Sequence, residues 1–136
     1  MNDLQIRQMQ ISAAKDEIRC CNELNQIYGL TLTEADITEL VELRGQALRS
    51  TGRVEFGGGI LPKLIRAFCK SPYVDPYNYA ATLGDLQDAF YYFKNESEDR
   101  FSDDELIEFM EKVFNGQAHG STEVLTTISL EELCRW

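Results

Sequence analysis

The sequence has little of what catalysis and metal binding usually require. Its 136 residues include one histidine and four cysteines, and no two cysteines form a C-x-x-C pair. The single histidine, His119, lies in a polar loop with no orienting group beside it, so we expect a solvent-exposed side chain rather than a catalytic one. We expect no zinc site, no other cofactor, and reduced, largely buried thiols at Cys20, Cys21, Cys69 and Cys134.

Long apolar segments are also absent. No apolar run approaches the roughly 20 residues that a membrane span needs. The N-terminal stretch, MNDLQIRQMQ, lacks the apolar centre of a secretory signal, so we expect a cytoplasmic protein. The chain carries 13 basic and 23 acidic residues, and its net charge of −10 argues against nucleic acid and anionic membranes as partners.

The charges are distributed unevenly along the chain. Residues 44–70, called the basic segment below, hold six basic residues and one acid, whereas residues 96–111 hold eight acids and one arginine. The basic segment faces the acidic remainder of the same molecule or of a second copy, or else it forms a site for an anion or an acidic partner. Its basic residues are Arg44, Arg49, Arg53, Lys63, Arg66 and Lys70.

Helix signals dominate the chain and predict an all-α fold, a single-domain bundle of five or six helices. Apolar residues recur at three- and four-residue spacing and predict helices at about residues 12–28, 34–50, 62–70, 76–93 and 103–115. Ser102 with Glu105, and Ser129 with Glu132, have the spacing of a capping box, and the second pair predicts a short last helix. Residues 1–12 are expected to form a helical extension or a loose arm.

Three consecutive glycines, Gly57, Gly58 and Gly59, interrupt the helical pattern. They predict a turn, with at most a very short strand at residues 54–56 before it. Because a helix with Lys63 and Arg66 follows, the turn offers backbone N–H groups and positive charge to a phosphate or carboxylate. The spacing matches neither G-x-x-x-x-G-K-[ST] nor G-x-G-x-x-G, so the other interpretation is a flexible connector.

Residues 88–110 locally resemble an EF-hand of the calmodulin type. An incoming helix with two phenylalanines is followed by twelve residues, 94–105, and by a helix that continues L-I-E-F-M. The resemblance implies calcium ligands at Glu96, Glu98, Ser102 and Glu105. However, Lys94 stands at the first ligand position and Asp99 at the position of the turn glycine, so we expect no calcium binding.

Several short motifs resemble an uncharacterised family of small, acidic, helical bacterial proteins, a domain of unknown function. The motifs are R-V-E-F-G-G at 53–58, L-P-K-L-I at 61–65, S-P-Y at 71–73, F-K-N-E-S at 93–97 and D-D-E-L-I at 103–107. The resemblance spans most of residues 25–135 and implies a bacterial, cytoplasmic protein. It implies no activity, ligand or catalytic residue.

Together these observations favour a protein-interaction or assembly module over an enzyme. Tyr91 and Tyr92 lie beside the apolar row of their helix, so they are either boundary tyrosines of the bundle or candidates for a partner surface. The expected partner is a protein, and a second copy of the chain is the first candidate because one molecule carries both signs of charge. The alternative is a small-ligand binder or enzyme that uses residues 57–59 and the basic segment.

Overall fold

The computed structural model describes residues 2–55 and 57–135, without the side chains of residues 128–131, 134 and 135. The described part contains no strand, so the all-α expectation is confirmed, while Phe56 of the expected short strand lies outside it. None of the described helices has both the length and the apolar character that a membrane crossing requires. The elements are α1 (Asp3–Asn25), the 3-10 turn η1 (Gln26–Tyr28), α2 (Glu34–Thr51), α3 (Ile60–Phe68), α4 (Tyr79–Glu96), α5 (Asp103–Asn115) and α6 (Thr122–Arg135).

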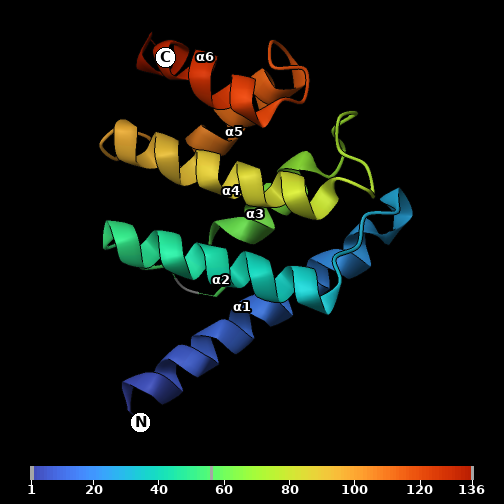
Figure 1. Cartoon of the computed structure of the whole chain (residues 1–136), viewed down its shortest axis with the longest axis vertical. Helices are drawn as coiled ribbons and strands as arrows, with labels where there is room; N and C mark the ends of the chain where they lie inside the picture. The colour runs from blue at the N-terminus through green and yellow to red at the C-terminus, as the bar shows by residue number, and fades with distance from the viewer. Residues whose placement is uncertain (1, 56, 136) are drawn as a thin grey trace.

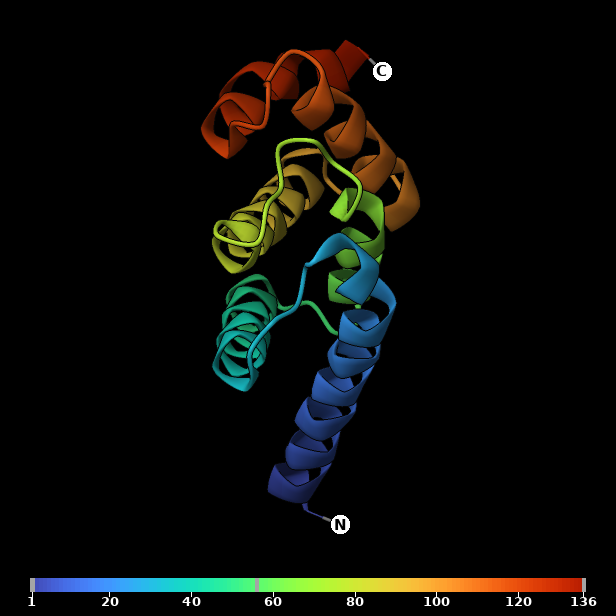
Figure 2. The ribbon, with the colours of Figure 1, turned by 90° about the vertical axis from the view of Figure 1, so that its right-hand side faces the viewer.

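Consecutive helices form three hairpins, α1–α2, α3–α4 and α5–α6, which stack on one another (Figure 1). Figure 2 shows the stack edge-on, with α1, α3 and α5 in one layer and α2, α4 and α6 in the other. Each helix contacts its hairpin partner and its neighbours within its own layer. This is the arrangement of a short α-solenoid, in which stacked helix pairs bury a continuous core between two layers.

The core between the layers is rich in phenylalanine. Phe68, Phe90, Phe93 and Phe114 are each at most 1% exposed. The rings of Phe68 on α3 and Phe114 on α5 meet edge to face with centroids 5.3 Å apart, and Phe93 on α4 meets Phe109 in the same way at 6.2 Å. Such edge-to-face pairs add to the free energy gained by burying the rings, and they join α3, α4 and α5.

Side-chain caps fix where the helices begin. The Ser102 hydroxyl accepts the Glu105 N–H at 3.1 Å and the Glu105 carboxylate accepts the Ser102 N–H at 2.9 Å, as the capping box predicts. The prediction of a helix start at Ser129 is wrong, because α6 already begins at Thr122. The Ser121 hydroxyl accepts the Val124 N–H at 3.2 Å and therefore caps α6 without the glutamate of a capping box.

The N-terminal stretch is a helical extension of α1 rather than a loose arm. Asn2 and Gln5 form a reciprocal capping box that starts the helix at Asp3, with their side chains accepting backbone N–H groups at 2.8 and 3.1 Å. Every residue from 2 to 13 is exposed, because the other helices cover only the second half of α1.

The cysteines divide between surface and interior. Cys21 and Cys69 are buried free thiols, as expected, whereas Cys20 is exposed, so the expectation of burial is wrong for this residue. Adjacent residues of a helix point about 100° apart, and the face that buries Cys21 therefore turns Cys20 to solvent. The side chain of Cys134 lies outside the described residues.

Alanine substitutions of the buried residues of α4 test whether this helix packs in the core as described. Leu86 and Phe90 are at most 1% exposed, and we expect Leu86→Ala or Phe90→Ala to lower the free energy of unfolding by about 2 to 5 kcal/mol. Urea denaturation followed by circular dichroism measures this loss. The control is Tyr77→Ala, because Tyr77 is 100% exposed and its truncation should change the stability by no more than about 0.5 kcal/mol. Equal effects of the core and control variants would contradict the described packing.

Candidate functional site

The first residue of the basic segment is buried in the fold. Arg44 is 5% exposed, its Nε donates to Glu55 Oε1 at 2.9 Å, and its Nη1 donates to the Gly57 carbonyl at 2.8 Å. Tyr91 completes the cluster by donating its hydroxyl to Glu55 Oε2 at 2.9 Å. Burial, and next the Glu55 carboxylate, raise the pKa of Tyr91, so the hydroxyl remains a donor. Arg44 therefore serves the fold and faces no external anion.

The adjacent tyrosines Tyr91 and Tyr92 lie in different environments, the first in the core and the second at the surface. Tyr91 is only 4% exposed and therefore belongs to the bundle rather than to a partner surface. The physical reason is the Glu55 carboxylate, which gives the buried Tyr91 hydroxyl a hydrogen-bond partner. Tyr92 is 40% exposed and remains a candidate for an interface.

The glycine turn already holds carboxylates of its own chain. The Gly58 N–H donates to Glu17 Oε2 at 2.9 Å, and the Ile60 N–H donates to Glu55 Oε1 at 3.4 Å. Gly57 and Gly59 have φ values of +57° and +59°, and a side chain on Gly59 would collide with the Glu55 carboxylate. The turn therefore has the chemistry of an anion site, as the sequence suggests, but two glutamates of the same chain use these N–H groups.

The other cations of the basic segment fall into two groups. Arg53 donates to Asp99 at 2.6 Å and Lys63 donates to Asp104 at 2.8 Å, so both face residues 96–111 of the same molecule. The remaining residues form no ion pair with any described residue and are exposed: Arg49, Arg66 and Lys70. The cations of the basic segment therefore lie on more than one surface: Arg44, Arg49 and Arg53 line one groove together with Gly57, whereas Lys63, Arg66 and Lys70 lie outside it.

In the EF-hand-like stretch, the positive charge of Lys94 is compensated by other residues of the stretch. Lys94 Nζ donates to the Phe101 carbonyl at 2.9 Å and pairs with Asp103 Oδ1 at 2.8 Å. Glu105, the expected bidentate ligand, caps α5 instead, and hydrogen bonds with Ser102 lower the pKa of the Glu105 carboxyl. Glu96 and Glu98 are exposed, and no group of three or more potential metal ligands is assembled in the part of the chain that the structure describes.

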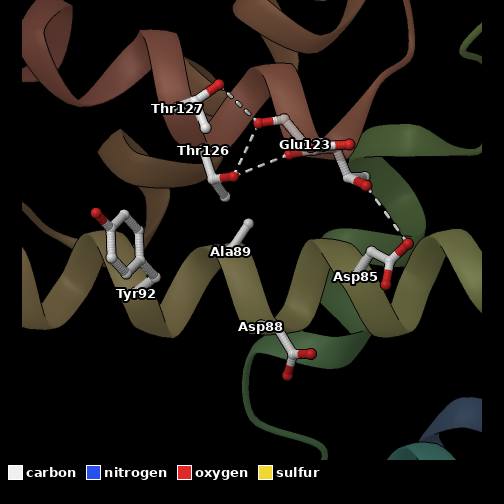
Figure 3. Close-up of a pocket in the computed structure, with 8 residues that line it drawn as sticks. Asp85, Asp88, Ala89, Tyr92, Glu123, Thr126 and Thr127 are labelled. Carbon is white, nitrogen blue, oxygen red and sulfur yellow. Dashed lines mark hydrogen bonds between the residues drawn. The ribbon is translucent and has the colours of Figure 1, made fainter.

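A groove between α4 and α6 forms the first half of an acidic surface that the sequence reasoning missed. The groove has a volume of about 420 Å³. Figure 3 shows that Asp85 points towards α6, whereas Asp88 points away from it. The Thr122 hydroxyl donates to Asp85 at 3.4 Å, and the groove is lined by Asp85, Asp88, Ala89, Tyr92, Thr122, Glu123, Thr126 and Thr127.

A second groove continues this surface between α2 and α4. It has a volume of about 460 Å³ and shares Asp85 and Asp88 with the first. The two grooves together are called the acidic face below. Among the residues that the structure describes, their lining contains no lysine or arginine, and its acids are Asp36, Glu39, Asp85, Asp88 and Glu123. Partial burial, and next the Asp85 charge, raise the pKa of Asp88.

One signal in the sequence could have indicated the acidic face. Asp85, Asp88 and Tyr92 follow one another at three- and four-residue spacing, so they lie in one row on α4. This row is offset from the buried seam of Leu86 and Phe90. Of the three residues in the row, only the tyrosine is of a type enriched at protein interfaces. The contributions of α2 and α6 could be assigned only after the hairpins had been stacked.

The stacked hairpins define the described part of the chain as a small α-solenoid with charged grooves between its helices. Residues 17–136 match the model of DUF6323, described as a family of unknown function, and the chain belongs to this family. The match confirms that the sequence motifs belong to a family of unknown function. Among the curated proteins and among the solved structures, no significant match was found.

The buried ion pair is open to a direct test. Glu55→Gln leaves Arg44 buried without its counter-charge, and we expect a loss of about 3 to 5 kcal/mol in the free energy of unfolding. The double variant Arg44→Met/Glu55→Gln removes both charges and should be less destabilised than Glu55→Gln alone. Urea denaturation measures both losses. A loss below about 1 kcal/mol for Glu55→Gln would show that Arg44 reaches solvent or another partner.

The EF-hand-like stretch provides a second test. Because the ammonium of Lys94 lies against Phe101 and Asp103, we expect calorimetry with calcium to show no binding in the range of calcium sensors, about 10⁻⁷ to 10⁻⁵ M. Binding in that range that is lost in Glu105→Gln would contradict this expectation. Glu111→Gln is the matched control, since it removes the same charge on α5 outside the stretch.

Proposed function

We propose that the protein is an interaction module whose acidic face binds a positively charged stretch of a partner protein. The observation that carries the proposal is the pair of adjoining grooves that share Asp85 and Asp88 and, among the described residues, are lined by no lysine or arginine. Neighbouring carboxylates without counter-charges create a negative potential that attracts and orients a cationic partner. Grooves between parallel helices of one layer also suit an extended or helical segment.

Tyrosines supply the part of the binding energy that charge alone does not. Exposed ion pairs contribute only about 0 to 1 kcal/mol each, so they steer a partner more than they hold it. Tyr77, which is 100% exposed, lines the groove between α2 and α4, and Tyr92 lines the one between α4 and α6. Each ring can contact an arginine or lysine side chain by a cation–π interaction and cover its aliphatic part.

The other candidate functions have weaker support. A small anion at the glycine turn would compete with Glu17 for the Gly58 N–H and with Glu55 for Arg44. A calcium ion at residues 94–105 would have to displace the Lys94 ammonium. The proposal therefore includes no cofactor, nucleic acid or membrane, and it places a non-enzymatic protein in the bacterial cytoplasm, as the composition and the resemblance imply.

A cationic peptide tests the acidic face. The probe is a fluorescein-labelled amphipathic peptide of about five helical turns with leucine at the heptad a and d positions and lysine or alanine elsewhere. We expect fluorescence anisotropy to show binding that weakens with salt. Because Asp85→Asn/Asp88→Asn removes up to two ion pairs, it should raise the dissociation constant roughly five- to thirtyfold.

The controls separate the site from total charge. Glu96→Gln/Glu98→Gln removes the same charge from exposed residues outside the acidic face and should change the affinity less than about twofold. Equal effects of the two double variants would show that only net charge matters, and the proposed site would then be wrong. Tyr92→Ala in the groove should also weaken the peptide, whereas Tyr28→Ala, which is likewise 40% exposed, should not.

The carboxylates of the acidic face repel one another, and this repulsion lowers the stability of the protein when no partner is bound. Because the pKa of Asp88 is raised, its contribution to stability is present below the unfolded pKa and is lost as pH rises through the folded value. We therefore expect Asp88→Asn to increase the free energy of unfolding at neutral pH by about 0.2 to 0.5 kcal/mol, the typical effect of like charges one turn apart. Thermal unfolding measured between pH 3 and 7 (about the titration range of a carboxyl) should show this gain only at the higher pH values.

A further inference from the structure

A groove of the opposite charge lies between α1 and α2. Figure 1 shows that the first half of α1 diverges from the second half of α2, and the groove between them has a volume of about 310 Å³. Its apolar lining residues include Ile11, Val41, Leu48 and Val54. Val54 is 76% exposed and Ile11 39%, so a substantial part of this apolar surface is open to solvent. We call it the basic groove because of the arginines described next.

The apolar residue that α1 contributes to the groove belongs to a row of side chains that is buried in the core farther along the helix. Leu4, Ile11 and Ile18 follow one another at seven-residue steps and therefore lie on one side of α1. Ile18 is fully buried, whereas Ile11 is 39% and Leu4 61% exposed. The row thus extends past the other helices by about two helical turns or more. A row of this kind normally packs against another helix.

The cations of the groove are only partly compensated. Arg44 and Arg53 are paired with Glu55 and Asp99, respectively. Arg7 and Arg49 also line the groove, are exposed, and form no ion pair with any described residue. Glu55, already engaged by Arg44, is the only acid among the described residues of the lining, so the groove carries excess positive charge on a molecule whose net charge is −10.

We propose that the basic groove binds an acidic amphipathic helix of a partner protein. An apolar floor with two uncompensated arginines at its edges is complementary to a helix with an apolar stripe between carboxylates. The diverging helices leave room for such a helix beside the exposed row of α1, where it would cover Leu4 and Ile11. The guanidinium groups of Arg7 and Arg49 would receive its carboxylates, and arginine suits this role because it binds carboxylates through two parallel hydrogen bonds.

A partner of different composition is favoured over a second copy of the chain. Two copies that each carry a net charge of −10 repel one another at low salt. In the acidic stretch at residues 96–111, Asp99 and Asp104 are already paired with Arg53 and Lys63. Self-association through Asp99 or Asp104 would have to break these internal pairs. An acidic helix from another protein would leave them intact.

The acidic counterpart of the lysine peptide tests the groove. This probe has the same leucines, with glutamate in place of every lysine, and anisotropy is again the measurement. Arg7→Glu/Arg49→Glu should weaken its binding at least roughly tenfold, because two attractions become repulsions. Arg66→Glu/Lys70→Glu is the matched control, since both side chains are exposed and lie outside the groove, and it should have less than about a twofold effect. Ile11→Ser should weaken binding without changing the slope of affinity against salt.

Three outcomes would overturn the proposal. The acidic peptide would fail to bind, or the two charge-reversal variants would weaken it equally, or sedimentation at low salt would show a dimer that Arg7→Glu/Arg49→Glu dissociates. The last result would identify a second copy as the occupant. Unchanged thermal unfolding of the groove variants confirms that they fold. Because these variants should leave lysine-peptide binding intact, a failure of this proposal is distinguishable from a failure of the acidic face.

Discussion

The buried pair of Arg44 and Glu55 is the interaction on which the arrangement of the first two hairpins depends. Arg44 belongs to α2, whereas Glu55 lies in the connection to α3 and also accepts the hydroxyl of Tyr91 on α4. A buried arginine is tolerated only when its charge and its donors are satisfied, so α2, the connection and α4 must meet in one geometry. The same connection contributes Val54 and Gly57 to the basic groove, and α4 contributes Asp85 and Asp88 to the acidic face. The ion pair therefore connects the elements that line the basic groove with the helix that carries Asp85 and Asp88.

Local sequence signals were sufficient to predict the fold class and most helix boundaries. Helix period and caps depend on residues three or four positions apart, so the start of α5 at Ser102 could be predicted from Ser102 and Glu105 alone. The start of α6 could not, because a serine without a following glutamate is a weak signal and Ser121 is one of several serines near the end of the chain. The stacking of the hairpins had no local signal, since the chain shows no internal repeat from which a solenoid could be inferred.

The candidate sites were harder to predict because clustering in sequence differs from clustering in space. The basic segment crosses α2, a connection and α3, so its cations point to different sides, and Arg44 points inward. The acidic face joins Asp36, Asp88 and Glu123, which belong to three hairpins and are separated by more than thirty residues of chain at each step. Charges so distant in sequence become neighbours only through the packing of α2, α4 and α6. The sequence therefore predicted that oppositely charged residues would form ion pairs. It could not predict which charged residues would lack an ion-pair partner or where on the surface they would lie.

In both the glycine turn and the EF-hand-like stretch, the charged group that the loop binds is a side chain of the protein itself. Glu17 supplies the anion at Gly58, and Lys94 supplies the cation at Phe101 and Asp103. An ion tethered in this way has an effective local concentration in the millimolar range or above, whatever the surrounding solution contains. The two loops consequently keep their shape without drawing on dissolved phosphate, carboxylates or divalent metals. The conformations of these two connections therefore depend on charged groups of the chain itself rather than on an ion taken from solution.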